Sequence, residues 1–143
     1  MRAWRLARRP YADLSGEGAR RFGGRWNSTG RPVIYAAADA ALAVLEVRVH
    51  LDLPPDLLPE DYVLMALDLD GIRAERLAEM PDDARAFGDA WLAEGRSAVL
   101  DVPSALVPES RNVLLNPAHS ESARARIASI RPFAFDRRLW LPL

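Results

Sequence analysis

The chain has 143 residues, about the length of one domain, and half of them are hydrophobic while 27% are charged, a composition ordinary for a soluble globular protein. It contains no cysteine and only two histidines, which excludes disulfide bonds, zinc thiolate sites and thiol nucleophiles and argues against a histidine metal site. All 19 basic residues are arginine, so a Schiff-base lysine and a phosphate-loop lysine are excluded as well.

The charges are distributed unevenly along the chain. Residues 1–31 carry eight arginines against two acids, a net charge of +6, whereas the remainder carries 11 arginines against 18 acids, a net charge of −7. The basic N-terminal segment suits a phosphate-bearing ligand. No apolar run approaches the roughly 20 residues of a membrane helix, and the N-terminus lacks the pattern of a secretory signal. We therefore expect a soluble, cytoplasmic protein with one domain spanning residues 1–143.

The first third of the chain combines strand patterns with a glycine-rich stretch. Residues Ala3–Ala7 alternate as a strand does, and Pro10 ends the pattern because proline cannot donate to a ladder. Five of the eight glycines fall within residues 10–32, which predicts a loop whose backbone approaches a ligand closely. Val33–Ala36 is predicted to be a short buried strand.

A helix and a long strand follow. Asp39 is a favourable N-cap for a helix over Ala40–His50, and the prolines after Leu53 end it because a residue before proline is displaced from the α region. Tyr62–Leu69 is rich in apolar and β-branched residues, which predicts a strand.

The second half of the chain predicts one further helix and several short strands. Pro81-Asp82-Asp83 opens the helix, which runs through Trp91 and Glu94 and ends at Gly95. The strands over Ala98–Val102 and Asn112–Leu115 are expected to pair. A short helix or turn around residues 120–125 precedes an extended segment over Ile127–Phe135. The whole pattern predicts an α+β domain with two or three helices.

Glu46 lies on the apolar flank of the helix predicted over Ala40–His50, without an obvious local partner. On a helix it shares a face with Leu42, Val49 and His50, while Arg48 projects from nearly the opposite side. No intrahelical ion pair therefore accounts for it. The carboxylate is either exposed at the edge of the helix or held in a cleft.

Arg25 and Tyr35 each have two interpretations. Arg25 follows two glycines, so its guanidinium either binds a phosphate through parallel N–H donors or is solvated at a tight turn. Tyr35 is either a core residue or a platform on which a flat heterocycle stacks.

Ser104 lies between prolines and apolar residues, without a Gly-x-Ser-x-Gly elbow. No sequence pattern indicates that His50 or His119 acts as a general base for Ser104, which argues against a serine hydrolase triad. We interpret Ser104 as a hydrogen-bond donor. The segment over Asn112–His119 is interpreted as mainly structural, and a direct role for His119 is left open.

Taken together, several short motifs resemble the RES-domain toxins of bacterial RES-Xre type II toxin–antitoxin modules. That family is named for an arginine, a glutamate and a serine, which correspond to Arg25, Glu46 and Ser104. The resemblance runs over nearly the whole chain in the same order. The matching motifs are Trp4-Arg5, Gly23-Gly24-Arg25-Trp26-Asn27, Tyr35-Ala36, Leu45-Glu46, Val102-Pro103-Ser104, Asn112-Val113-Leu114-Leu115-Asn116-Pro117 with His119, and Phe135-Asp136 with Arg138-Leu139.

The resemblance implies an ADP-ribosyltransferase-like fold with a split, mainly antiparallel β core and two or three flanking helices. It implies NAD as substrate, cleavage of the nicotinamide–ribose bond, growth arrest, and neither a metal nor another cofactor. The acceptor is left open between inorganic phosphate, water and a protein. A cognate Xre-type helix-turn-helix antitoxin is implied as partner, with DNA contacted only through it, and no membrane is expected.

In this hypothesis one carboxylate suffices, because nicotinamide leaves from a cationic state and needs no general acid, unlike the leaving group of an ordinary glycosidase. Glu46 stabilises the oxocarbenium ion, Arg25 binds the diphosphate and Ser104 orients ribose or amide groups. The expected substrate-binding residues are Arg5, Trp26, Tyr35 and Asn116.

Two alternatives differ in acceptor or in class. A protein mono-ADP-ribosyltransferase would share every site residue. A nucleic-acid-binding module is suggested by the basic first 31 residues and by Trp4, Trp26 and Tyr35, although the acidic remainder and a pI of about 6.1 argue against it.

Overall fold

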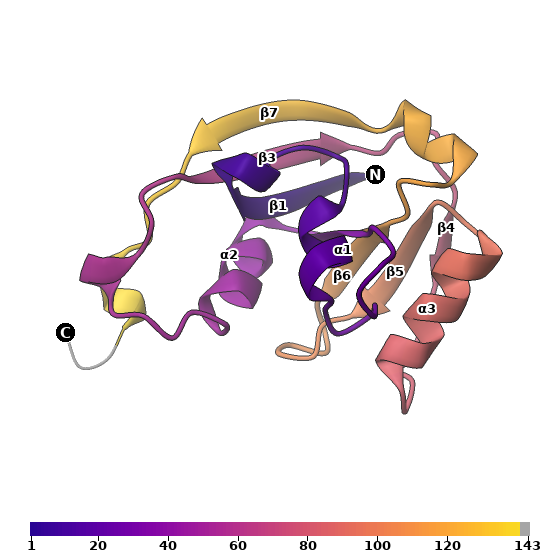
Figure 1. Ribbon diagram of the computed structural model, residues 1–143, viewed down its shortest axis with the longest axis horizontal. Coiled ribbons are helices and arrows are strands. Elements are labelled where there is room, and N and C mark those ends of the chain that lie inside the picture. Colours follow the sequence, from indigo (N-terminus) through magenta and orange to yellow (C-terminus); the bar gives the residue numbers. More distant parts are fainter. Residues whose placement is uncertain (141–143) are drawn as a thin grey trace.

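The computed structural model describes residues 1–140, which form a seven-stranded sheet with helices packed against it (Figure 1). The strands are β1 (Arg2–Arg8), β2 (Ile34–Ala37), β3 (Tyr62–Asp68), β4 (Ala74–Arg76), β5 (Val99–Pro103), β6 (Arg111–Leu115) and β7 (Arg126–Pro132). The α-helices are α1 (Glu17–Phe22), α2 (Ala40–Arg48) and α3 (Ala84–Glu94). Short 3-10 helices are η1 (Arg9–Tyr11), η2 (Pro55–Leu57), η3 (Ser120–Arg124) and η4 (Arg137–Leu139).

The sheet is split near its middle. Its strand order is β4-β5-β6-β2-β1-β3-β7, and every neighbouring pair is antiparallel except β4 and β5. Strands β1 and β2 meet only at Trp4 and Ala37, whereas β1 and β3 are paired along seven residues. The expected α+β fold with a split, mainly antiparallel core is confirmed.

Local sequence signals account for the two longer helices. Asp39 caps α2 by accepting a hydrogen bond from the Leu42 N–H at 2.8 Å, and Asp83 caps α3 through the Ala86 N–H at 3.0 Å. Gly95 ends α3 with a φ of 60°, a left-handed conformation that favours glycine. These predicted boundaries are confirmed to within three residues at each end.

Among the α-helices and strands, two were not predicted. Helix α1 lies in the glycine-rich stretch, where Glu17 forms ion pairs with Arg20 and Arg21. Strand β4 is three residues long and forms by parallel pairing with β5. Neither has the length or periodicity that a sequence pattern requires.

The apolar core has three main parts. The largest cluster spans both halves of the sheet and contains Ile34, Met65 and Val99. A second cluster packs α3 against β5 and β6, and a third packs α2 against β1 and β3. Since residues of the second and third clusters both line one pocket, the site lies where these two packed regions meet.

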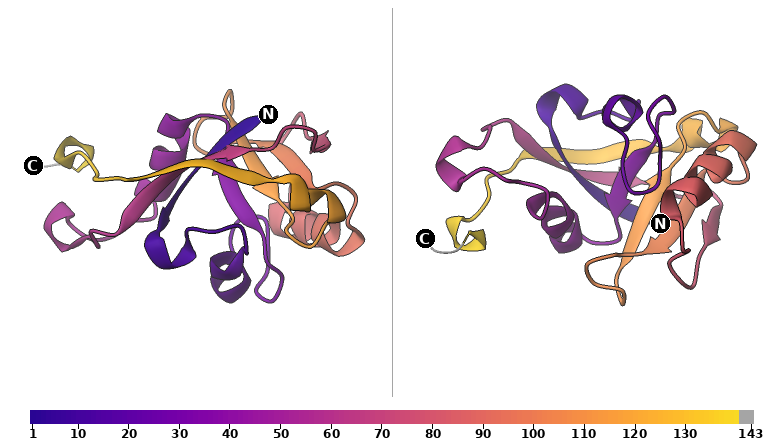
Figure 2. Two further views of the ribbon diagram at one scale, coloured as in Figure 1. Left: turned by 90° about the horizontal axis from the view of Figure 1, so that it is seen from above. Right: turned by 60° about the horizontal axis from the view of Figure 1, so that its bottom comes forward.

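The C-terminal segment is attached to the end of α2. The Arg48 guanidinium lies 4.1 Å from the centre of the Trp140 ring and donates to the Leu139 carbonyl at 2.9 Å. The Trp140 indole N–H donates to the Leu53 carbonyl at 2.9 Å. Figure 2 shows the C-terminal segment and η2 at the same end of the molecule, beyond the sheet. None of the helices within residues 1–140 is long and apolar enough to span a membrane.

Candidate functional site

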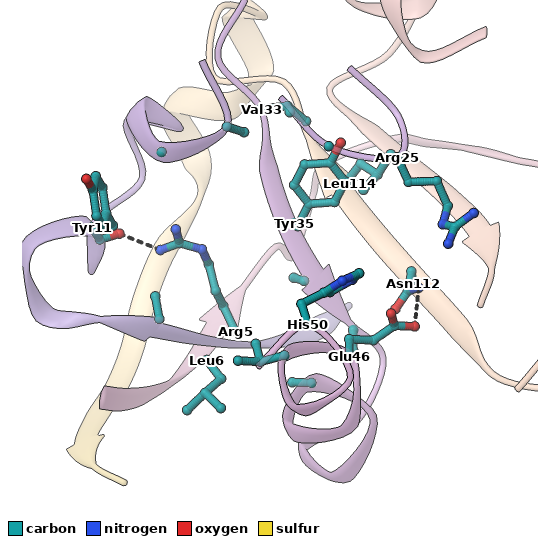
Figure 3. Close-up of a pocket in the computed structure, with 18 of the residues that line it drawn as sticks. Arg5, Leu6, Tyr11, Arg25, Val33, Tyr35, Glu46, His50, Asn112 and Leu114 are labelled. Carbon is teal, nitrogen blue, oxygen red and sulfur yellow. Dashed lines mark hydrogen bonds between the residues drawn. The ribbon is translucent and has the colours of Figure 1, made fainter. Parts of the chain in front are cut away.

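A pocket of about 480 Å³ lies beside β1, β2 and α2 (Figure 3). Its volume falls within the range of about 300–1,000 Å³ that is usual for small-molecule sites. One wall is formed by β1 and η1, the opposite wall by residues 22–26, and α2 and β6 close the remaining side. Most lining side chains are apolar or aromatic. The charged or polar ones that matter below are Arg5, Arg25, Tyr35, Glu46, His50 and Asn112.

Glu46 is held at the pocket by two hydrogen bonds to one carboxylate oxygen. Its Oε1 accepts from the Ser104 hydroxyl at 2.7 Å and from the Asn112 amide at 2.8 Å. Within residues 1–140, no group donates to its Oε2. Two donors fix the orientation of the carboxylate and leave one oxygen for a ligand. The structure therefore agrees with the interpretation in which the Glu46 carboxylate is held in a cleft.

Ser104 contacts Glu46 and does not line the pocket. It follows β5, and only 1% of its surface is exposed. Its Oγ accepts from the N–H groups of Leu106 and Val107 at 3.1 and 3.2 Å while donating to Glu46. The turn therefore directs the hydroxyl toward the carboxylate. The interpretation of Ser104 as a hydrogen-bond donor agrees with its contact to Glu46, and its expected role in orienting the substrate stays a prediction.

Asn112 was not singled out for the site by the sequence. Asn112 is the first residue of β6 that pairs with β2, and its partner there is Ala37. Ala37 lies two residues before the N-cap of α2. This register brings the Asn112 amide to Glu46 across 66 residues of sequence. Its only local signal was a polar residue at the start of an otherwise apolar strand.

Arg25 projects from a tight turn. The backbone groups of Gly24 and Asn27 bond to each other at 3.0 and 3.4 Å. A Cβ added at Gly24 would lie 2.6 Å from the Tyr35 hydroxyl oxygen, so glycine is required there. Within residues 1–140 the exposed Arg25 guanidinium has no hydrogen bond or ion pair, and in Figure 3 it lies on the same side of the pocket as Glu46 and Asn112.

Arg5 lies on the opposite wall and is already hydrogen-bonded. Its Nη1 donates to the carbonyl oxygens of Tyr11 at 2.6 Å and Asp13 at 3.3 Å. Burial lowers the pKa of the Arg5 guanidinium, and the nearby Asp13 opposes that shift. The carbonyls therefore hold Arg5 within the protein's own structure.

Tyr35 and Trp26 are joined by a hydrogen bond but face different surroundings. The Tyr35 hydroxyl donates to the Asn27 Oδ1 at 2.6 Å and accepts from the Trp26 N–H at 3.0 Å. Burial raises the pKa of Tyr35 to about 12, and its ring lines the pocket. Trp26 borders the same pocket but is only 3% exposed and packs edge to face with Phe87 in the core. Trp26 therefore supports the wall of the pocket, and its expected part in substrate binding stays a prediction.

Asn116 and His119 lie outside the pocket lining. The Asn116 amide donates to the Leu92 carbonyl at 3.4 Å, and its Oδ1 accepts from the Ala118 N–H at 3.0 Å. The His119 Nδ1 accepts from the Glu121 N–H at 3.1 Å and caps η3. The buried polar atoms of Asn116 are thus satisfied by α3 and by the turn after β6, and its expected contact with substrate stays a prediction. His119 has a structural contact of the same kind.

His50 lines the pocket one helical turn beyond Glu46. It also lines a second cavity of about 710 Å³, which shares Gly23, Gly24 and Arg25 with the first. The sequence had placed His50 on the face of Glu46 without giving it a role. Within the part of the chain that the structure describes, no group of three or more His, Asp or Glu side chains is placed to hold a metal ion.

Comparison with known proteins identifies the family. Residues 2–136 match the model of a family described as the RES domain. This chain belongs to the RES domain family. The three residues for which the resemblance was noted are brought together in this RES domain, because Ser104 contacts Glu46 and Arg25 shares the pocket with Glu46.

Similar proteins cover the RES domain almost end to end. "Toxin Res" of Pseudomonas putida is 37% identical over 96% of this chain and 98% of its own. The "Prs ADP-ribosylating toxin" of Sphingobium sp. strain YBL2 is 37% identical over 95% of this chain and 94% of its own. The crystal structure of the M. tuberculosis MbcT–MbcA toxin–antitoxin complex aligns with a TM-score of 0.73 at 23% identity, over 93% of this chain and 84% of that chain. The last likeness concerns the fold.

Proposed function

We propose that this RES-domain protein is the toxin of a toxin–antitoxin system and degrades NAD by cleaving the nicotinamide–ribose bond. The observation that carries the proposal is the geometry of Glu46. Within residues 1–140 it is the one carboxylate lining the pocket, its Oε1 is held by Ser104 and Asn112, and it shares the pocket with Arg25.

A single carboxylate matches the chemistry of this bond. When the bond from the ribose C1 to the pyridinium nitrogen breaks, its electron pair neutralises the nitrogen, and nicotinamide leaves without needing a proton. The positive charge passes to the ribose as an oxocarbenium ion. Glu46 stabilises that charge through its free oxygen and accepts a hydrogen bond from a ribose hydroxyl. A group of this kind contributes on the order of 3 kcal/mol to transition-state stabilisation.

The basic groups of the pocket suit the rest of the dinucleotide. The Arg25 guanidinium is available to bind the diphosphate with two parallel N–H donors. Tyr35 presents its ring to the pocket, where it is available to pack on the nicotinamide. Arg5 contributes positive potential from the opposite wall, because its guanidinium is already held by the two carbonyls.

The names of the relatives support a toxin and favour a second candidate reaction. One relative is named "Toxin Res" and another "Prs ADP-ribosylating toxin". The second name supports the alternative in which this chain transfers ADP-ribose to a protein. The same pocket would bind NAD, and a protein nucleophile would replace phosphate or water at the ribose carbon.

An antitoxin is the proposed partner. The structure with a similar fold was solved as a toxin–antitoxin complex. We propose a cognate Xre-type helix-turn-helix antitoxin that covers the pocket and supplies the only contact with DNA. Expression of the chain alone should lower cellular NAD and arrest growth, and co-expression with the neighbouring antitoxin should prevent both. Unaffected growth with well-folded protein would count against toxicity.

The acceptor is tested by incubating purified protein with NAD, with and without inorganic phosphate, and separating the products by chromatography. ADP-ribose 1″-phosphate indicates phosphorolysis, and free ADP-ribose indicates hydrolysis. Label transferred from adenylate-labelled NAD to a protein indicates ADP-ribosylation. Intact NAD under all these conditions would contradict the proposed function. Salt-sensitive RNA binding without NAD loss would instead support the nucleic-acid-binding alternative.

A further inference from the structure

One face of α3 contacts the turn that carries Arg25, here called the Arg25 loop (residues 23–28). The Arg85 Nε donates to the Gly24 carbonyl at 3.2 Å. Asp89 accepts twice from Ser28, from its N–H at 2.8 Å and from its hydroxyl at 2.6 Å. Residues 85 and 89 are one helical turn apart, so they project from the same face of α3.

Gly88, between them on that face, allows the helix to approach the loop. A Cβ added at Gly88 would lie 1.8 Å from the Trp26 carbonyl oxygen and 2.7 Å from its carbonyl carbon. Any larger residue would have to push the helix and the loop apart. Three residues of this face therefore meet the Arg25 loop. Arg85 contacts Gly24, Gly88 lies against Trp26, and Asp89 contacts Ser28.

The other side of the Arg25 loop is held by Asn27 and Tyr35. The Asn27 Nδ2 lies within hydrogen-bond distance of the carbonyls of Ala19, Ser28 and Arg31, at 2.9, 3.1 and 3.4 Å. The Tyr35 hydroxyl bonds to the Trp26 N–H and to the Asn27 side chain. Both chain neighbours of Arg25 are thus fixed, whereas the Arg25 side chain itself is exposed and borders both cavities.

We infer that α3 is a positioning element for Arg25, with Asp89 as its principal residue and Gly88 and Arg85 as supports. The inference rests on the proposed function in that Arg25 binds the diphosphate of the dinucleotide. Asp89 acts through the Arg25 loop, because its carboxylate oxygens are occupied by Ser28. A preformed loop loses less conformational freedom when the ligand binds, which strengthens binding.

Variants of Asp89 distinguish a positioning role from a purely electrostatic effect of its charge. A carboxylate near a diphosphate site disfavours the anion, so removing that charge alone should strengthen anion binding. Removing the two hydrogen bonds should weaken it by releasing the loop. The two explanations predict changes of opposite sign, and the amide variant keeps an acceptor for the Ser28 N–H without the charge.

The experiment compares Asp89→Ala, Asp89→Asn and Ser28→Ala with the wild type, and uses Glu60→Ala as a control that removes an exposed acid elsewhere. The measurements are the KM and kcat for NAD and the binding of inorganic pyrophosphate by calorimetry. We expect Asp89→Ala to raise the KM for NAD about tenfold, within the roughly hundredfold effect of a 1 Å misplacement of a positioning group. The kcat should change less, and pyrophosphate binding should weaken in parallel. Asp89→Asn should bind pyrophosphate as tightly as the wild type or more tightly, and Glu60→Ala should resemble the wild type.

Hydrogen exchange provides a readout that does not require turnover. The amides of the Arg25 loop should exchange faster in Asp89→Ala and Ser28→Ala than in Asp89→Asn. Thermal melts show that each variant is folded at the assay temperature. If Asp89→Ala does not fold, the same measurements on Ser28→Ala test the inference. Ser28→Ala removes one of the two hydrogen bonds, so its expected effect is smaller.

The inference fails if wild-type protein does not bind pyrophosphate, if Arg25→Ala binds it as tightly as wild type, or if Asp89→Ala binds it as tightly or more tightly. It also fails if Asp89→Ala consumes NAD with a normal KM, and the proposed function then stands. If pyrophosphate binding and exchange change as expected but wild type never consumes NAD, the positioning role stands and the proposed function fails.

Discussion

The two walls of the pocket each present an arginine, but the two side chains are in opposite states. On the β1 wall, Arg5 is half-buried, and its Nη1 donates to the carbonyls of Tyr11 and Asp13. On the loop wall, the Arg25 guanidinium is exposed and, within residues 1–140, has no protein partner. Of the two pocket-lining arginines, Arg25 is therefore the stronger candidate for ligand binding, because Nη1 of Arg5 already donates to the protein.

The difference arises from how the backbone of each wall is satisfied. After β1 the chain turns back through η1, which brings two carbonyls to Arg5. The backbone of the Arg25 loop is instead satisfied by Tyr35, Asn27 and α3. Since these contacts need nothing from Arg25, its guanidinium is left for a ligand.

The largest effect is expected for Glu46→Gln, at the carboxylate of the pocket, which should reduce turnover of NAD by about 10²–10³-fold or more. The glutamine carbonyl can still accept from Ser104 and Asn112, so the pocket and the melting temperature should be preserved. The measurement is kcat for NAD consumption together with a thermal melt, and Glu60→Gln is the matched control. Normal turnover by Glu46→Gln would show that the catalytic assignment is wrong.

Arg25→Ala should raise the KM for NAD by about 10–100-fold, since hydrogen bonds to charged groups contribute about 1.5–3 kcal/mol. The free energy of unfolding should change little because the side chain is exposed and has no protein partner among residues 1–140. Steady-state kinetics and denaturant unfolding measure the two quantities. A loss of stability with an unchanged KM would reverse the assignment of this wall.

Arg5→Ala should give the opposite profile. The carbonyls of Tyr11 and Asp13 lose their donor, which should lower the free energy of unfolding by about 1–3 kcal/mol. The KM for NAD should rise less than in Arg25→Ala. If Arg5→Ala affects the KM as strongly as Arg25→Ala while stability is retained, the proposed contrast between the two walls is wrong.

Ser104→Ala should lower kcat by about tenfold, which corresponds to about 1.4 kcal/mol, with little change in KM. The substitution removes one of the two donors that orient Glu46 and leaves Asn112 in place. Asn112→Ala is the matching variant for the other donor. A change in KM alone would indicate that Ser104 contacts the substrate and not Glu46.

Tyr35 provides the smallest effect at neutral pH. Burial raises its pKa to about 12, above the value of about 10 for an unfolded tyrosine. The folded state therefore retains the proton longer, and the contribution of Tyr35 to stability should be constant below about pH 10 and be lost between about pH 10 and 12. Denaturant unfolding against pH should show this loss in wild type and a smaller one in Tyr35→Phe. Equal pH dependence in the two proteins would contradict the raised pKa.

Much of the fold was predictable because its signals are local. Asp39 and Asp83 cap helices through N–H groups three residues away, and Gly95 ends α3 through its own backbone conformation. The strands over residues 62–69 and 112–115 follow from apolar β-rich runs. Strand β4 was missed because its three residues depend on pairing with β5.

The constellation of Arg25, Glu46 and Ser104 could be recognised from residue types and their order along the chain, which amino-acid identity specifies directly. The identity of the group that each side chain contacts could not be recognised in this way. Glu46 meets Ser104 across 58 residues of sequence and Asn112 across 66. Arg5 and Asn116 donate to backbone carbonyls, and Trp26 packs in the core. Such contacts depend on strand register and helix packing, which bring distant segments together only when the whole chain has folded.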